Sequence, residues 1–76
     1  MLRGFYRHYK GGIYRLKSIA MHTETEEQLV IYQCTKSQGV WARPLKMFQE
    51  KVTYDGKTVD RFTYIGNNID DVSKTE

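Results

Sequence analysis

The 76-residue sequence has a single cysteine and a single proline, and it contains no long hydrophobic run. Because Cys34 has no partner, an intramolecular disulfide is excluded, and an unpaired thiol is typical of a reducing compartment. No apolar stretch approaches the roughly 20 residues that a membrane-spanning helix needs. Residues 1–4 are not followed by the apolar region of a signal peptide. We therefore expect a soluble cytoplasmic protein with no membrane partner.

The short length predicts one domain with a thin core, because a chain of this size buries only roughly 60% of its unfolded surface. We expect a single β-barrel domain over residues 1–66 and a polar C-terminal tail over residues 67–76. In that tail only Ile69 and Val72 are apolar.

Positive charge is concentrated near the N-terminus. The net charge is +3, and residues 1–22 hold five cations and no carboxylate, namely Arg3, Arg7, Lys10, Arg15 and Lys17. A basic half attracts anions or nucleic acid. Solvated cations also keep edge strands from pairing with neighbouring molecules. Both interpretations stay open from the sequence.

Short β-branched and aromatic runs alternate with turn residues, which is typical of a small sandwich or barrel. We expect strands over residues 5–9, 13–21, 28–34 and 40–43. The alternation in the second of these changes phase, which predicts a bulge or sharp bend near Lys17 and Ser18. Cys34 follows an apolar run, so we expect a buried structural thiol.

The second half of the chain predicts a helical turn followed by a hairpin. Pro44 suits the first position of a helix, and Leu45 and Phe48 would share one side of that turn. A fifth strand follows at residues 51–54, and Asp55-Gly56 is typical of a two-residue hairpin. That turn predicts the pairs Tyr54–Lys57, Val52–Val59, Lys51–Asp60 and Glu50–Arg61, and the chain then continues as a strand over residues 61–65.

Several motifs in order resemble the bacterial domain of unknown function 1653 family. They are Gly4-Phe5-Tyr6-Arg7-His8-Tyr9-Lys10-Gly11-Gly12-x-Tyr14, His22-x-Glu24-Thr25-x-Glu27, Val30-x-Tyr32, Trp41-x-Arg43-Pro44-Leu45-x-Met47-Phe48, Asp55-Gly56-Lys57 and Arg61-Phe62. The resemblance covers about residues 4–65. It implies an SH3-like small β-barrel, which agrees with the strands expected above. We therefore expect an all-β, SH3-like barrel of about five strands with one short helical or 3₁₀ turn near Pro44 to Phe48. The resemblance implies no known activity, and at Asp60 the chain departs from the proline that the pattern often carries.

Catalysis and metal binding have little support in the sequence. His8, His22 and Cys34 are the only soft ligands, without the paired spacing of a zinc site. A Cys–His pair needs hydrogen-bond contact between the two side chains, and the expected burial of Cys34 argues against one. We expect no catalytic residues, no metal and no cofactor.

Six residues combine stacking faces with hydrogen-bond donors and are the candidate binding site: Arg7, His8, Tyr9, Lys10, Trp41 and Arg43. Aromatic rings stack on bases or proline faces, and arginine binds phosphate or carboxylate. Trp41 and Arg43 share one side of a strand. They would either line a groove with His8 and Tyr9 or belong to the core, or Arg43 would be a structural clamp paired with Glu24 or Glu27.

The sequence therefore predicts a non-catalytic binding module with an aromatic and basic groove, present as a monomer or weak homodimer. One alternative is the binding of RNA or single-stranded DNA on the basic N-terminal hairpin. Another is a small-molecule or nucleotide site with hydrolytic chemistry at His8 and His22. The ligand is unidentified, and an anionic one suits the charge distribution.

Overall fold

The computed structural model describes residues 1–67 of the chain. Within them, in chain order, lie β1 (Phe5–His8), β2 (Ile13–Met21), β3 (Gln28–Cys34), β4 (Val40–Pro44), α1 (Leu45–Phe48), β5 (Lys51–Tyr54), β6 (Lys57–Asp60) and β7 (Phe62–Gly66). The all-β class and the short helix are confirmed. The helix found in this part of the chain is too short to cross a membrane. Apart from Asn67, the expected C-terminal tail lies outside the described residues.

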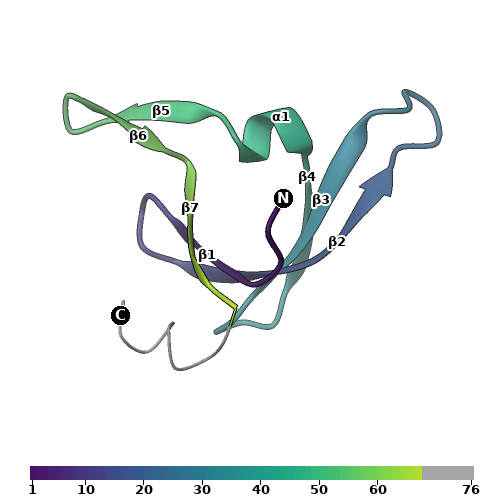
Figure 1. Cartoon of the computed structure of the whole chain (residues 1–76), viewed down its shortest axis with the longest axis horizontal. Helices are drawn as coiled ribbons and strands as arrows, with labels where there is room; N and C mark the ends of the chain where they lie inside the picture. The colour runs from purple at the N-terminus through teal and green to yellow at the C-terminus, as the bar shows by residue number, and fades with distance from the viewer. Residues whose placement is uncertain (68–76) are drawn as a thin grey trace.

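Five strands form one antiparallel sheet in the order β4-β3-β2-β1-β7, and β5 and β6 form a separate two-stranded sheet. Figure 1 shows the larger sheet bent into a U, with β1 and β2 at its base and α1 and the β5–β6 hairpin across its open side. Within the described residues β4 and β7 remain as edges, so the expected small all-β domain is an open, bent sheet and not a closed barrel. The chain changes sheet at Arg61, which separates β6 from β7 and brings the described strands above the expected five.

The expected registers are confirmed at the hairpin and at the bulge. Asp55 and Gly56 both have positive φ, as a two-residue hairpin turn requires. The pairs Lys51–Asp60, Val52–Val59 and Tyr54–Lys57 form as predicted, and ion pairs join Lys51 to Asp60 and Glu50 to Arg61. In β2 the register shifts between Leu16 and Ser18, leaving Lys17 as the extra residue.

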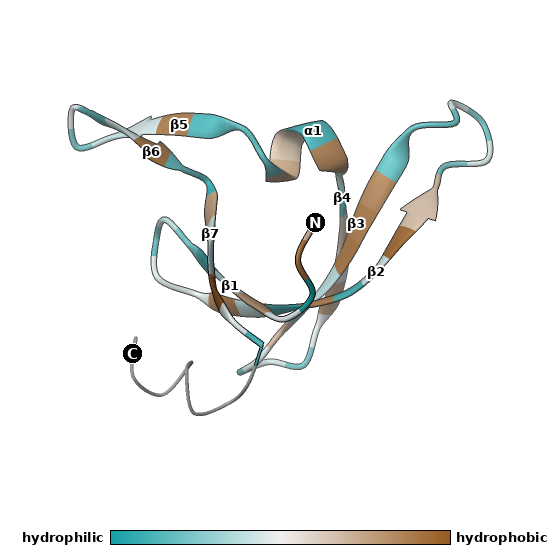
Figure 2. Cartoon of the chain, viewed as in Figure 1, coloured by the Kyte–Doolittle hydropathy of each residue, from teal (hydrophilic) through white to brown (hydrophobic). Residues whose placement is uncertain are grey.

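The core lies on the inner side of the bent sheet and is mostly aromatic. Its buried residues are Tyr6, Leu16, Val30, Tyr32, Phe48 and Phe62. Phe48, brought in by α1, stacks on Phe62 of β7 with ring centroids 4.0 Å apart. Figure 2 shows hydrophobic residues along β3 and in α1, and hydrophilic residues at the tips of the β2–β3 and β5–β6 hairpins. The helix therefore covers the core that a closed barrel would have enclosed.

The prediction of a buried Cys34 is wrong, because its side chain is only half-buried. It continues the inward series of Val30 and Tyr32, but it ends β3 where the core has already stopped. Hydrogen bonds from the Ser37 backbone and hydroxyl, followed by the Lys36 backbone, lower the pKa of the Cys34 thiol.

Candidate functional site

Four of the six predicted binding residues gather around one pocket, which we call the hairpin pocket. The first hairpin contributes Arg7, His8, Tyr9 and Lys10. The opposite wall comes from the second hairpin and β7, with Tyr54, Val59, Asp60 and Thr63. Its volume is about 430 Å³, which is within the range of pockets that hold small ligands.

The first hairpin reaches its position through a tight glycine turn and a backbone link to the second. Gly11 has a φ of 109°, which favours glycine, and its N–H donates to the His8 carbonyl at 2.7 Å. The Tyr9 N–H donates to the Arg61 carbonyl at 2.9 Å, just where the chain leaves β6. The Tyr9 and Tyr54 rings meet edge to face at 5.2 Å. The two walls of the pocket are therefore held together by both backbone and side-chain contacts.

His8 forms the aromatic floor of the hairpin pocket as a neutral ring. Its centroid lies 4.5 Å from that of Tyr9 and 5.0 Å from that of Phe62. Burial lowers its pKa, and the nearby cations Arg43, Arg61 and Lys10 lower it further. Its Nδ1 accepts a hydrogen bond from the Lys10 N–H at 3.1 Å, so the neutral ring carries its proton on Nε2.

The free charge of the hairpin pocket is positive. Asp60 is its one carboxylate, and Lys51 binds that carboxylate at 2.9 Å. Arg7 and Lys10 are exposed, and within residues 1–67 neither forms an ion pair. The Lys10 Nζ lies 5.8 Å from the centroid of Tyr9, so a cation and a ring are presented together.

Trp41 and Arg43 are absent from the lining of the hairpin pocket, although Arg43 and His8 both lie against the ring of Phe62. In the β3–β4 register Trp41 lies opposite Tyr32 and Arg43 opposite Val30, which places both on the inner side of the sheet. Trp41 is still 58% exposed, because β4 is an edge strand. The half-buried Arg43 donates to the Tyr32 hydroxyl, and in residues 1–67 its guanidinium forms no ion pair with Glu24 or Glu27.

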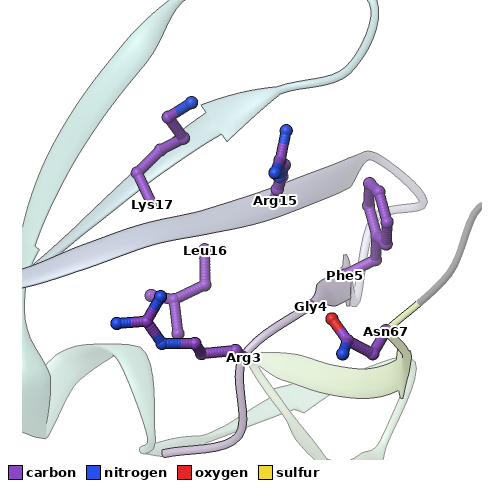
Figure 3. A pocket seen from close by; sticks show the side chains of 7 residues that line it. All are labelled: Arg3, Gly4, Phe5, Arg15, Leu16, Lys17 and Asn67. Carbon is purple, nitrogen blue, oxygen red and sulfur yellow. The ribbon is translucent and has the colours of Figure 1, made fainter.

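A second pocket of about 430 Å³ lies where the N-terminal segment passes β2, and we call it the basic pocket. Figure 3 shows Arg15 and Lys17 rising from β2 on one side, with Arg3 extending from the N-terminal segment. The ring of Phe5 and the amide of Asn67 stand at its other end. It has three cationic side chains and no carboxylate in its lining.

The wall that carries Arg3 is anchored by hydrogen bonds. The Tyr6 hydroxyl donates to the Leu2 carbonyl, and the Tyr64 hydroxyl donates to the Arg3 carbonyl at 3.1 Å. The Leu16 N–H donates to the Gly4 carbonyl at 2.9 Å. Gly4 has a φ of 135°, and a Cβ there would lie 2.4 Å from the Gly66 carbonyl oxygen. Glycine is therefore required for the N-terminal segment to pass so close to β7.

The site residues predicted from the sequence do not include Arg3, Phe5, Arg15, Lys17 or Asn67. The excess of cations over residues 1–22 was the available signal, and the alternation of Arg15 and Lys17 along β2 strengthens it. Asn67 lines the basic pocket because the end of β7 lies beside the N-terminal segment, and no local sequence pattern shows that contact.

The possible catalytic groups are not brought together in residues 1–67. His8 is hydrogen bonded to Gly12 just before β2, and His22 follows the last residue of β2, so the two histidines lie at opposite ends of a nine-residue strand. The His22 Nδ1 instead accepts from the Glu24 and Thr25 N–H groups at 3.1 and 3.3 Å. No three His, Cys, Asp or Glu side chains in this described part gather into a group that could hold a metal ion.

Comparison with known proteins identifies a family. The model of the family described as "Protein of unknown function (DUF1653)" matches residues 4–64. A crystal structure of a DUF1653 protein from Bordetella bronchiseptica is 31% identical, covers 90% of this chain and 91% of its own, and superposes with a TM-score of 0.82. A comparison with curated proteins gives no match. With a family match over most of its length and a similar solved structure, this chain belongs to the DUF1653 family.

Proposed function

We propose that this protein is a non-catalytic module that binds an anionic ligand on its β1–β2 hairpin. The observation that carries the proposal is that two pockets built on this hairpin each combine cations with an aromatic ring. Arg7 and Lys10 accompany Tyr9 in one, and Arg3, Arg15 and Lys17 accompany Phe5 in the other. The single carboxylate among these linings, Asp60, is already bound by Lys51.

Two features support binding in place of catalysis. The reactive side chains have other partners, since Cys34 hydrogen bonds with Ser37 while His8 packs among rings. The pockets are also shallow and lie on the outside of a thin core, so they offer little shelter from water to a reacting group. Arginine and lysine beside a ring suit an anion that also has a planar part.

A thermal unfolding series with inorganic pyrophosphate and thymidine monophosphate tests the proposal. A ligand at 100 times its Kd stabilises the folded state by about 2.7 kcal/mol, so the Tm should rise by several degrees. The double variants Arg7→Gln/Lys10→Gln and Arg15→Gln/Lys17→Gln should each reduce that rise. The matched control Lys36→Gln/Lys46→Gln removes two exposed cations elsewhere and should keep it. Tm values that no anion raises would refute the proposal.

A further inference from the structure

We propose that the ligand is a single-stranded nucleic acid that lies across β1 and occupies both pockets at once. This inference rests on the proposed function and names its class of partner. It starts from the position of the two pockets on one continuous surface. Phe5 lines the basic pocket and Arg7 lines the hairpin pocket.

The Phe5 wall of the basic pocket and the Arg7 wall of the hairpin pocket are neighbours on the outer side of β1. Phe5 and Arg7 are alternate residues of β1, on the side opposite the buried Tyr6. Their Cα atoms are therefore roughly 7 Å apart, at about 3.4 Å per residue. In the β1–β2 register Phe5 lies opposite Arg15. A row of cation, ring and cation thus runs from Arg15 through Phe5 to Arg7.

A ligand that uses this row must be elongated and must carry several anionic groups. A lone phosphate can satisfy the cations of one pocket only, and it leaves those of the other unneutralised. The cations in question are exposed, and in residues 1–67 none of Arg7, Arg15 and Lys17 is held in an ion pair. Binding a polyanion would therefore break no ion pair in this part of the chain.

The rings favour nucleic acid over an acidic peptide. Phe5 in one pocket and Tyr9 with Tyr54 in the other supply stacking faces beside the cations. A nucleic acid strand carries a planar base and a phosphate in each unit, and unpaired bases stack on such rings with little sequence preference. A duplex keeps its bases stacked within the helix, so the rings select for the single strand. An acidic peptide would use the cations and leave the rings unused.

The backbone that carries the cations of the basic pocket is anchored before any ligand arrives. The Arg3 carbonyl is held by the Tyr64 hydroxyl and the Gly4 carbonyl by the Leu16 N–H, so the N-terminal wall is tied to both neighbouring strands. Arg15 and Lys17 flank Leu16, whose side chain is buried in the core. Such anchoring reduces the conformational entropy that binding would otherwise cost.

Fluorescence anisotropy with a labelled thymidine oligomer of about 10 nucleotides, a typical site size, tests the inference. The Kd of the full chain for the oligomer should be lower than that for thymidine monophosphate by about tenfold or more, because the oligomer reaches both pockets. Arg15→Gln/Lys17→Gln should weaken binding and reduce the slope of log K against log salt by about 1.4, from about 0.7 per phosphate contact. Phe5→Leu should weaken binding several-fold and leave the slope unchanged, because it removes a ring and no charge. Lys36→Gln/Lys46→Gln is the matched control, and thermal unfolding verifies that each variant is folded.

The possible outcomes separate this inference from the function on which it rests. If the oligomer binds no more tightly than pyrophosphate while Arg7→Gln/Lys10→Gln still weakens pyrophosphate, the hairpin binds small anions and the inference is overturned. Equal binding of polyglutamate, or an unchanged affinity in Phe5→Leu, would overturn nucleic acid as the partner. Equal binding of the oligomer as a duplex would overturn the single strand. Failure of every anion to bind would instead remove the proposed function itself.

Discussion

The half-buried guanidinium of Arg43 lies against the core. Its Cζ is 6.0 Å from the centroid of Phe62, and its Nε donates to the Tyr32 hydroxyl at 3.4 Å. The same guanidinium is one of the cations that lower the pKa of His8. The positive charge of Arg43 therefore disfavours protonation of His8 in the hairpin pocket.

Arg43→Ala should lower the free energy of unfolding by about 1 kcal/mol, since a partly exposed cation–π contact contributes roughly 0.5–1 kcal/mol and the bond to Tyr32 is long. This expected loss is larger than that for a solvent-exposed side chain and smaller than that for a broken buried ion pair. Urea denaturation of both forms measures it. A loss of unfolding free energy above about 3 kcal/mol would mean that Arg43 is a structural clamp, because that is the cost of breaking a buried ion pair.

His8 should make the protein less stable as the pH falls. Its pKa in the folded state is below that of the unfolded chain, so the unfolded chain binds more protons between the two values. Stability present above about pH 6.5, the ordinary value, is therefore lost as the pH falls toward the folded-state pKa. Urea midpoints at several pH values between neutrality and mild acid should show this loss in the wild type.

His8→Asn is the matching variant, because the side-chain oxygen of asparagine can still accept a hydrogen bond from the Lys10 N–H, while the titrating imidazole is gone. Its urea midpoint should change less than that of the wild type over the same pH range. An identical pH dependence in the two proteins would show that His8 is not the group responsible.

The strands that could be predicted best from the sequence are those that flank residues typical of a tight turn. Asp55-Gly56 determines the whole β5–β6 register, because a two-residue turn with positive φ at both positions leaves one pairing possible. The bounds of β2 and β3 also follow from alternation and flanking turns. What the sequence did not show is that the chain changes sheet at Arg61, since that break depends on the contact with Tyr9, which is distant in the chain.

Gly56→Val should lower the urea midpoint, at a cost of about 1–2 kcal/mol, because a β-branched residue is strained at a φ of 75°. A Cβ at this position would meet nothing within 4 Å, so the cost is one of backbone conformation alone. Gly56→Asn is the matched control, since asparagine adopts positive φ more readily. Equal midpoints for the valine and asparagine variants would contradict this account of the turn.

At the largest scale, residues 1–67 form a bent sheet covered by a short helix. In this part of the chain the main core cluster has six buried side chains, and four of them are aromatic. The sequence indicated the rings but not which would face inward, because the direction of each ring follows from the bend of the sheet. Trp41 and Arg43 were grouped with His8 and Tyr9 from the sequence. The β3–β4 register places Trp41 beside Tyr32 and Arg43 beside Val30, and Arg43 and His8 both lie against the Phe62 ring.

Phe48 should be the most sensitive position of this core. It is 2% exposed, stacks on Phe62 and contacts Tyr6 and Tyr32 edge to face. Phe48→Ala should cost about 3–5 kcal/mol, a large part of the total stability of roughly 4–11 kcal/mol expected for 76 residues. Met47→Ala, on the exposed side of the same helix, should cost less than about 1 kcal/mol. Similar losses in the two variants, measured by urea denaturation, would mean that α1 does not cover the core as described.

Amide NMR during a titration with inorganic pyrophosphate tests most directly whether the β1–β2 hairpin binds anions. The account predicts that the shift changes concentrate on residues 3–17, with smaller ones on residues 54–63 of the facing wall. The Trp41 indole and the amides of β4 should stay in place, because they lie outside both pockets. Shift changes centred on Trp41 and Arg43, or none at any residue, would contradict it.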